Sequence, residues 1–326
     1  MPLPVRRLET PTPYAVGPVN AYLIEAEPPT LVDSGISTPE AEARLFELLG
    51  DDVDRIERIL ITHGHPDHYG LMHTVARRAG ASVHFPEREL VRLTTKGLLR
   101  DWGKLLLAQG MPMELLIQMD EHRKKDPRPR VRVEEVSPMA HGQLFAFDGF
   151  ELEAHHNPGH TGGHMVFFER GSRVLLAGDQ LLPDVSPNPL LEPSFDAEEV
   201  DARAAEGPVG RRRSLREYLD SLEALAALAP VIAYPGHGAP VEDPAALIER
   251  TQRHHLRRKR QLAQALGTEA QTPFELALRM YPRVRGYDVF LAVSEVVAHL
   301  DLVVEDGGAA SEERDGVAYY RATSAA

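Results

Sequence analysis

The most chemically suggestive part of this sequence is the run His63-Gly64-His65-Pro66-Asp67-His68. It follows an apolar, strand-like segment, so the first two histidines point to the same side if the extended geometry continues. The glycine and the proline favour a turn that keeps Asp67 and His68 close to them. Imidazole and carboxylate groups are ligands of zinc, iron and manganese. The run therefore predicts a metal site, in preference to a polar loop with incidental histidines.

Three later segments each place one potential ligand beside a glycine at the end of a strand-like stretch. They are Asn157-Pro-Gly-His160-Thr-Gly-Gly-His164, Leu175-Leu-Ala-Gly-Asp179 and Tyr234-Pro-Gly-His237-Gly. Glycine lets backbone and solvent approach closely at such a position. A single instance is more often an ordinary turn, but with the four candidates of the six-residue run the three make seven potential ligands.

Composition limits what the site can be. The chain has no cysteine, which excludes thiolate ligands, disulfides and a cysteine nucleophile. Its formal net charge of −13 makes the chain as a whole a poor binder of phosphate backbones. No stretch approaches the roughly 20 apolar residues of a membrane span, and no secretory signal is evident, so a cytoplasmic location is expected.

With these motifs in place, residues 15 to 240 resemble the metallo-β-lactamase superfamily. The resemblance implies that His63, His65 and His160 hold one metal ion, that Asp67, His68 and His237 hold a second, and that Asp179 bridges the two. It also implies that Asp33, in Leu31-Val-Asp-Ser-Gly, supports the histidine loop. The cysteine-free ligand set is similar to that of hydroxyacylglutathione hydrolases, lactonases and nucleases of the superfamily. Two divalent ions are therefore expected, zinc first, with iron or manganese as alternatives.

Two ions against two carboxylates leave such a site net positive. It can then hold a bridging hydroxide near neutral pH, because metal binding lowers the pKa of water to about 7. We expect this hydroxide to be the nucleophile of a metal-dependent hydrolase. Asp67 is the predicted catalytic residue, which orients the hydroxide and carries its proton.

The elements that must position these residues follow an α/β alternation. The resemblance specifies a four-layer αββα sandwich, expected over residues 1–243. Strands are predicted at 19–25, 29–32, 58–62, 131–136, 143–147, 151–156, 164–169, 173–176 and 231–234, and helices at 38–49, at 67–79 and from 214. Residues 87–126 are predicted to be a helical insertion, and 182–213 a long loop. Three helical segments (from 244, 272–281 and 288–301) and a strand at 317–321 outline a small winged-helix-like domain, 244–326.

Several residues carry weaker hypotheses. His164 is predicted to be a pocket residue or a structural strand histidine, and the remaining histidines of the catalytic region (His73, His84, His155 and His156) are predicted to be structural or supporting. The apolar segment 98–107 with Trp102, together with Met111 and Met113, is expected to pack in a core or to form a lid. The basic segment 250–260 is either a solvated helix face or a nucleic-acid patch.

Three functions remain open at this point. The favoured one is hydrolysis of a small-molecule ester, thioester or lactone. An endoribonuclease acting on single-stranded RNA is the first alternative, because a metal domain followed by a winged-helix-like tail resembles the β-lactamase-like endoribonucleases. Arg211-Arg-Arg213 and the basic segment support it, whereas the acidic catalytic region opposes it. An iron-dependent enzyme similar to persulfide dioxygenases is the second, although it needs only one metal. No membrane partner is expected, and a homodimer is left open.

Overall fold

A computed structural model describes residues 3–94, 98–124, 129–187, 189–194, 210–286 and 288–323. The chain divides into two compact units, each with its own apolar core. Unit 1 contains residues 1–94, 127–187 and 221–249, and unit 2 contains residues 95–126, 188–220 and 250–326. The predicted domain boundary at 243/244 stays a prediction.

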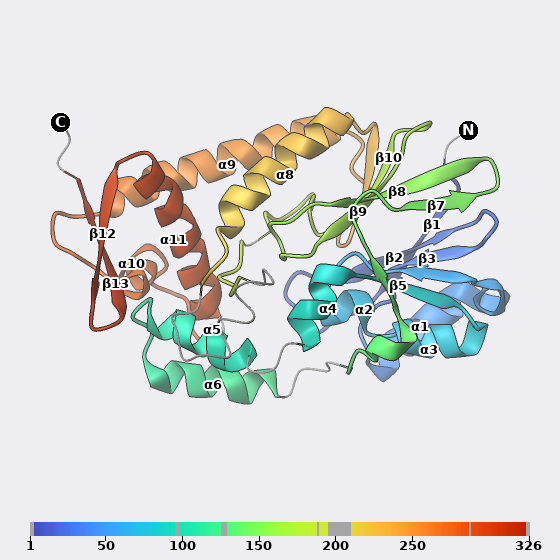
Figure 1. The fold of residues 1–326 in the computed structure, drawn as a ribbon, viewed down its shortest axis with the longest axis horizontal. Coiled ribbons are helices and arrows are strands. Elements are labelled where there is room, and N and C mark those ends of the chain that lie inside the picture. Colours follow the sequence, from blue (N-terminus) through green and yellow to red (C-terminus); the bar gives the residue numbers. More distant parts are fainter. Residues whose placement is uncertain are drawn as a thin grey trace. The chain divides into compact units, whose positions relative to one another are not determined.

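Unit 1 is built on two β-sheets (Figure 1). The first has the order β1-β2-β3-β4-β5-β6, with β1 (Val5–Thr10), β2 (Val19–Ile24), β3 (Thr30–Val32), β4 (Arg58–Leu60), β5 (Ser82–Pro86) and β6 (Ser137–Met139). The second has the order β11-β10-β9-β8-β7, with β7 (Leu144–Phe147), β8 (Phe150–His156), β9 (Met165–Glu169), β10 (Val174–Gly178) and β11 (Ile232–Pro235). Strands β3 to β6 run parallel, as do β10 and β11.

The first sheet is buried on both faces, because successive side chains of a strand point to opposite faces and both sets are apolar here. In β2, Leu23 packs with α1 (Pro39–Leu49) and α3 (Met72–Ala79), whereas Tyr22 and Ile24 pack against side chains of the second sheet. Figure 1 shows α1 and α3 on one side of this sheet and the strands β7 to β10 on the other. On the second sheet, the backbone of α8 (Ser214–Leu228) accepts a hydrogen bond from Asn157, which follows β8. The layers are those of the αββα sandwich expected.

Unit 2 is mainly helical. It contains α5 (Leu98–Leu107), α6 (Met113–Arg123), α10 (Pro273–Met280), α11 (Asp288–Glu305), part of α9 (Pro244–Ala265) and the antiparallel hairpin of β12 (Ala309–Arg314) and β13 (Val317–Ala322). Leu105, Leu106 and Met111 are buried with α10 and α11, as the packing interpretation of this apolar segment expects. Its role as a lid stays a prediction.

Three helices followed by a hairpin reproduce the winged-helix-like order, with one strand more than expected. The sequence had not indicated β12, and it also missed β1, β5 and β6. Strand β1, Val-Arg-Arg-Leu-Glu-Thr, carries three charged residues at the edge of its sheet and therefore lacks an apolar signature. The expected loop 182–213 falls partly on residues 195–209, outside the described residues. In the described part of the chain, no helix has the length and apolarity needed to cross a bilayer.

Two predicted elements are wrong in detail. Residues 131–136 were expected to form a strand, but a short 3-10 helix occupies Val133–Glu135, where none of the three side chains is buried. The helix expected at 67–79 is divided into α2 (Pro66–Tyr69) and α3. It breaks at Leu71 (φ −98°, ψ 2°), whose N–H donates to Gly35 O at 3.2 Å instead of to the preceding turn. Tertiary contact overrides helix propensity here.

Candidate metal centre

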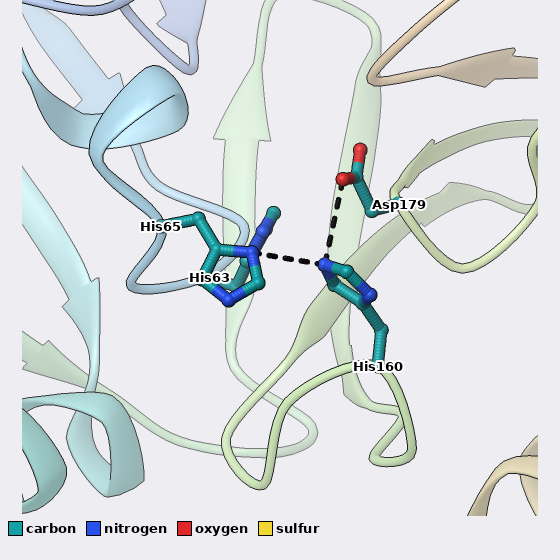
Figure 2. Close-up of side chains that lie close together, drawn as sticks. All are labelled: His63, His65, His160 and Asp179. Carbon is teal, nitrogen blue, oxygen red and sulfur yellow. Dashed lines mark hydrogen bonds and ion pairs between the residues drawn. The ribbon is translucent and has the colours of Figure 1, made fainter. Parts of the chain in front are cut away.

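The first group of potential ligands consists of His63, His65, His160 and Asp179, whose ligand atoms lie within 4.8 Å of one another. Figure 2 shows the three imidazoles and the carboxylate converging. His65 Nδ1 and His160 Nε2 are 3.0 Å apart, and His160 Nε2 is 3.4 Å from Asp179 Oδ2. His63 lies beside them, with its ring centroid 4.7 Å from that of His65. The structure thus brings together residues that are more than a hundred positions apart in sequence.

The second group consists of Asp67, His68 and His237 and meets the same spacing. His237 Nε2 lies 3.4 Å from Asp67 Oδ2 and 3.6 Å from Asp179 Oδ2. His68 Nε2 lies 3.4 Å from the other oxygen, Asp179 Oδ1. The Asp179 carboxylate therefore faces both groups, which is the position that a bridging ligand requires.

Strand ends place the ligands. His63 follows β4, and His65 is the N-cap of α2, with Pro66 at the first helical position. Asp179 and His237 come directly after the parallel strands β10 and β11, whose ends are joined by a hydrogen bond from Gly236 N to Gly178 O of 2.7 Å. Parallel strands bring their carboxyl ends to one edge of a sheet, as in other α/β sites.

Glycine at position 236 is required by space. A Cβ atom there would lie 2.1 Å from Asp179 Oδ1 and 2.7 Å from His68 Cε1. Any larger side chain would therefore push the shared carboxylate or the imidazole out of place. The glycine beside His237 in the sequence motif thus serves the neighbouring ligands as well as the turn.

Hydrogen bonds behind the ligands fix the orientation of three imidazoles. Asp33 Oδ2 accepts from His68 Nδ1 at 2.7 Å and from Thr62 Oγ1 at 2.8 Å. With its hydroxyl hydrogen engaged by Asp33, Thr62 Oγ1 accepts from His63 Nδ1 at 3.0 Å. His237 Nδ1 donates to a backbone carbonyl, Pro18 O, at 2.8 Å. In its neutral form each ring therefore carries its lone pair on Nε2, the nitrogen that a metal ion would use. The support expected from Asp33 is present.

The residues fit a pair of divalent ions. All seven groups are imidazoles or carboxylates, and five of the seven are buried, His65 and His160 being partly exposed. The buried atom His63 Nε2 has no hydrogen-bond partner among the described residues. A buried nitrogen lone pair without a donor is costly, and a metal ion would satisfy it.

The charges around the potential ligands shift their pKa values in opposite directions. Burial and then the imidazole of His68 hold the pKa of His63 well below its ordinary value. Burial alone would raise the pKa of Asp179, but His68 and His237 more than offset it and hold that pKa well below the usual range. His68 itself has a raised pKa, since Asp179 and Asp33 outweigh the effect of its burial. Asp179 is thus ionised and His63 neutral at neutral pH.

The other histidines take supporting or structural places. His164 is fully buried, and its Nε2 accepts from Asp179 N at 3.1 Å, so it supports the strand end that carries the shared carboxylate. His156 donates to Gly162 O, and His155 lies 3.5 Å from Glu153. His73 accepts from a backbone amide, and His84 packs edge-on against Phe145.

Two buried residues at this site were missed by sequence reasoning. Glu89 is fully buried on α4 (Glu87–Thr94), and its carboxylate accepts hydrogen bonds from Gly64 N at 3.1 Å, Thr161 Oγ1 at 2.6 Å and Gly163 N at 2.8 Å. Arg92 donates to Glu89 Oε2 at 2.8 Å and to Gly64 O at 2.9 Å. The Glu89–Arg92 pair therefore ties the loop of His63 and His65 to the loop of His160.

A helical Glu and Arg three residues apart usually form a solvated surface pair. Here the two side chains are 0% and 6% exposed. The spacing alone gave no sign of this burial, because the loops that cover the pair lie about 25 and 70 positions away. The clue available in sequence was the number of glycines in those two loops.

Comparison with known proteins identifies the family. The model of the metallo-beta-lactamase superfamily matches residues 14–237, which include all seven ligand positions. The chain belongs to the metallo-beta-lactamase superfamily. It is a hydrolase of this metal-dependent superfamily.

Two similar proteins cover nearly the whole chain, and a third covers most of it. A probable metallo-hydrolase of Bacillus subtilis, YqjP, is 29% identical over 324 residues, 96% of each chain. The crystal structure of a metallo-beta-lactamase family protein from Thermus thermophilus, TTHA1429, superposes with a TM-score of 0.79 at 29% identity, covering 98% of this chain and 99% of that one. The atrochrysone carboxyl ACP thioesterase of Aspergillus fumigatus is 26% identical over 236 residues, 72% of this chain and 55% of its own.

Proposed function

We propose that this protein is a dinuclear metal-dependent hydrolase acting on a small-molecule ester, thioester or lactone, with a thioester as the first candidate. The observation that carries the proposal is the complete set of seven ligand groups, in which Asp179 faces both halves of the site. In this proposal His63, His65 and His160 hold one ion, and Asp67, His68 and His237 hold the other. Zinc is the first expectation for both.

When bound, two such ions would supply a polarised carbonyl oxygen and a water with a pKa lowered to about 7. Side chains of the protein transfer the proton and orient the imidazoles. In this proposal Asp67, which is 5% exposed, accepts a proton from the attacking water at Oδ2 and returns it to the leaving thiolate or alkoxide. Asp33 and Thr62 keep His68 and His63 in their binding tautomers throughout.

A thioester is favoured among the three substrates by one similar protein, the fungal ACP thioesterase, which overlaps 72% of this chain. Hydrolysis then breaks the C–S bond, and the water oxygen becomes part of the released carboxylate. A lactone or oxygen ester would pass through the same steps with an alkoxide leaving.

The endoribonuclease alternative loses the support of its arginine motif in unit 2. All three consecutive arginines that favoured it are paired with carboxylates: Arg211 with Asp301, Arg212 with Glu192 and Glu217, and Arg213 with Glu305. In the basic segment, Arg258 faces Glu295, and Lys259 faces Asp306. Arginines already engaged in this way make poor phosphate ligands. The persulfide dioxygenase alternative gives no reason for the second ligand group.

The experiment is a substrate comparison on metal-loaded protein. Acyl thioesters, lactones and single-stranded RNA are each incubated with the wild-type protein and with the Asp179→Ala variant. We expect turnover of the thioesters, at least a hundredfold reduced in the variant. RNA cleavage that disappears in Asp179→Ala, with no ester or thioester turnover, would overturn the proposal in favour of the nuclease.

A further inference from the structure

A second histidine cluster lies in unit 2. It belongs to a different stretch of the sequence and to a different apolar core from the metal centre of unit 1. His254 and His255 on α9 and Glu295 on α11 each offer one ligand atom, and these atoms lie within 4.8 Å of one another. In the part of the chain that the structure describes, three groups meet this spacing, and the other two are the halves of the metal centre.

The imidazole of His255 is held as a metal-binding imidazole usually is. His299 Nδ1 lies 2.8 Å from the backbone carbonyl Glu295 O, which can only accept, so Nδ1 carries the hydrogen. The remaining nitrogen, His299 Nε2, is then an acceptor and lies 3.3 Å from His255 Nδ1, which must donate. This arrangement makes Nε2 the acceptor nitrogen of the His255 ring. Metal-ligating histidines typically donate their other ring hydrogen to such a partner.

Burial keeps these rings neutral. It lowers the pKa of His255 to about 3, with the neighbouring imidazole of His299 adding to the effect, and it lowers the pKa of His299 to about 4. Burial also lowers the pKa of His254. Neutral rings agree with the donor and acceptor roles that the two hydrogen bonds assign to His255 and His299.

The carboxylate in the cluster already faces one cation. Arg258 Nε lies 3.5 Å from Glu295 Oε1, and the guanidinium sits over the ring of Tyr281, 5.3 Å from its centroid. Burial raises the pKa of Glu295, with Arg258 and His254 opposing that rise. A second cation beside Glu295 must therefore overcome repulsion from Arg258, which moderates its affinity without removing a ligand.

We propose that His254, His255 and Glu295 bind a divalent transition-metal ion, of the class of Zn²⁺ or Ni²⁺, and thereby fasten α9 to α11. Two imidazoles and one carboxylate are a ligand set that such ions accept, with water completing the coordination. The ion is structural in this proposal, since α9 and α11 pack together in the core of unit 2.

The test is equilibrium dialysis of the full chain against increasing Zn²⁺, with bound metal measured by mass spectrometry. The wild-type protein should take up one Zn²⁺ more than the His254→Gln variant. His254 is only half-buried, so this variant should stay folded. The matched control is His141→Gln, at an exposed histidine outside the three groups, which should bind as much Zn²⁺ as the wild type.

Two further variants locate the ion. Glu295→Gln should weaken uptake of the extra Zn²⁺ at least tenfold, and Arg258→Met should tighten it severalfold because the competing charge is gone. Added Zn²⁺ should also raise the unfolding temperature seen by Trp102, the only tryptophan of the chain, which contacts Phe290 on α11. Equal stoichiometry in wild type and His254→Gln, or an Arg258→Met variant that binds no better, would overturn the proposal and leave the cluster as a buried hydrogen-bonded pair.

Discussion

Replacing Glu89 by glutamine should disturb the metal centre although this residue is not a predicted ligand. The carboxylate accepts four hydrogen bonds, three from the two ligand loops and one from Arg92. Glutamine has one acceptor oxygen, so its amide group would face two donors. A buried donor without an acceptor costs about 1–3 kcal/mol. Removing one partner of a buried ion pair costs about 3–5 kcal/mol. We therefore expect Glu89→Gln to lower the free energy of unfolding by about 3–5 kcal/mol.

Metal binding should weaken as well, because the loops that carry the histidines are no longer held in register. Loss of a supporting partner typically costs about 10–100-fold in metal affinity. The measurement is Zn²⁺ affinity by competition with a chromogenic chelator, combined with urea unfolding followed by circular dichroism. At saturating Zn²⁺ the variant should still bind the full complement of ions, since no ligand has been removed.

Two further variants test whether the effect belongs to the buried carboxylate of Glu89. Glu87→Gln removes the same charge from an exposed position on the same helix and should leave both quantities unchanged. Arg92→Met should cost less than Glu89→Gln, since Glu89 keeps its three loop donors. If Glu89→Gln binds Zn²⁺ as tightly as the wild type and unfolds at the same urea concentration, the Glu89–Arg92 pair does not position the loops.

Three other outcomes follow from the structure. Gly236→Ala should abolish binding of at least one metal ion while the chain stays folded, because the added methyl would lie 2.1 Å from Asp179 Oδ1; Gly267→Ala, where the nearest atom is 3.5 Å away, is the control, and metal analysis is the measurement. Acid should destabilise unit 2, because the folded state keeps His255 neutral, with a pKa of about 3, whereas the unfolded chain protonates it below about pH 6.5. The free energy of unfolding should therefore fall as the pH drops below 6.5, by up to about 1.4 kcal/mol per pH unit for this histidine. Urea unfolding followed by Trp102 fluorescence at pH 6.5 and 5 should give a flatter dependence for His255→Phe, and an unchanged slope would contradict the assignment. Chelation should abolish turnover, and added Zn²⁺ should restore it; activity that survives exhaustive chelation would contradict a metal-dependent reaction.

The convergence of the potential ligands could be predicted from sequence because most of them stand beside glycine or proline where a strand gives way to a turn. A turn of that kind has few ways to fold, so residue type and spacing carry most of the information. The αββα layers followed from the same alternation of strands and helices. Strand β1 was not predicted, because Arg6, Arg7 and Glu9 interrupt its apolar pattern. Its hydrogen bonds to β2 nevertheless make it a strand.

What could not be predicted depends on contacts between segments distant in the chain. The pairing of Glu89 with Thr161 spans 72 positions, and that of His255 with His299 spans 44. No local periodicity encodes either. The pairing of Arg211 with Asp301, 90 positions away, likewise turns a basic motif in the sequence into a neutral feature of the fold.

The place of α4 in the chain has a consequence for protein engineering. Glu89 and Arg92 belong to the first helix of segment 87–126, yet unit 1 extends to residue 94. A chimera that exchanged the whole segment between relatives would therefore discard the side chains that brace the histidine loops. Grafts that begin after Thr94 should preserve catalysis, and those that begin at Glu87 should need a compatible acidic and basic pair from the donor.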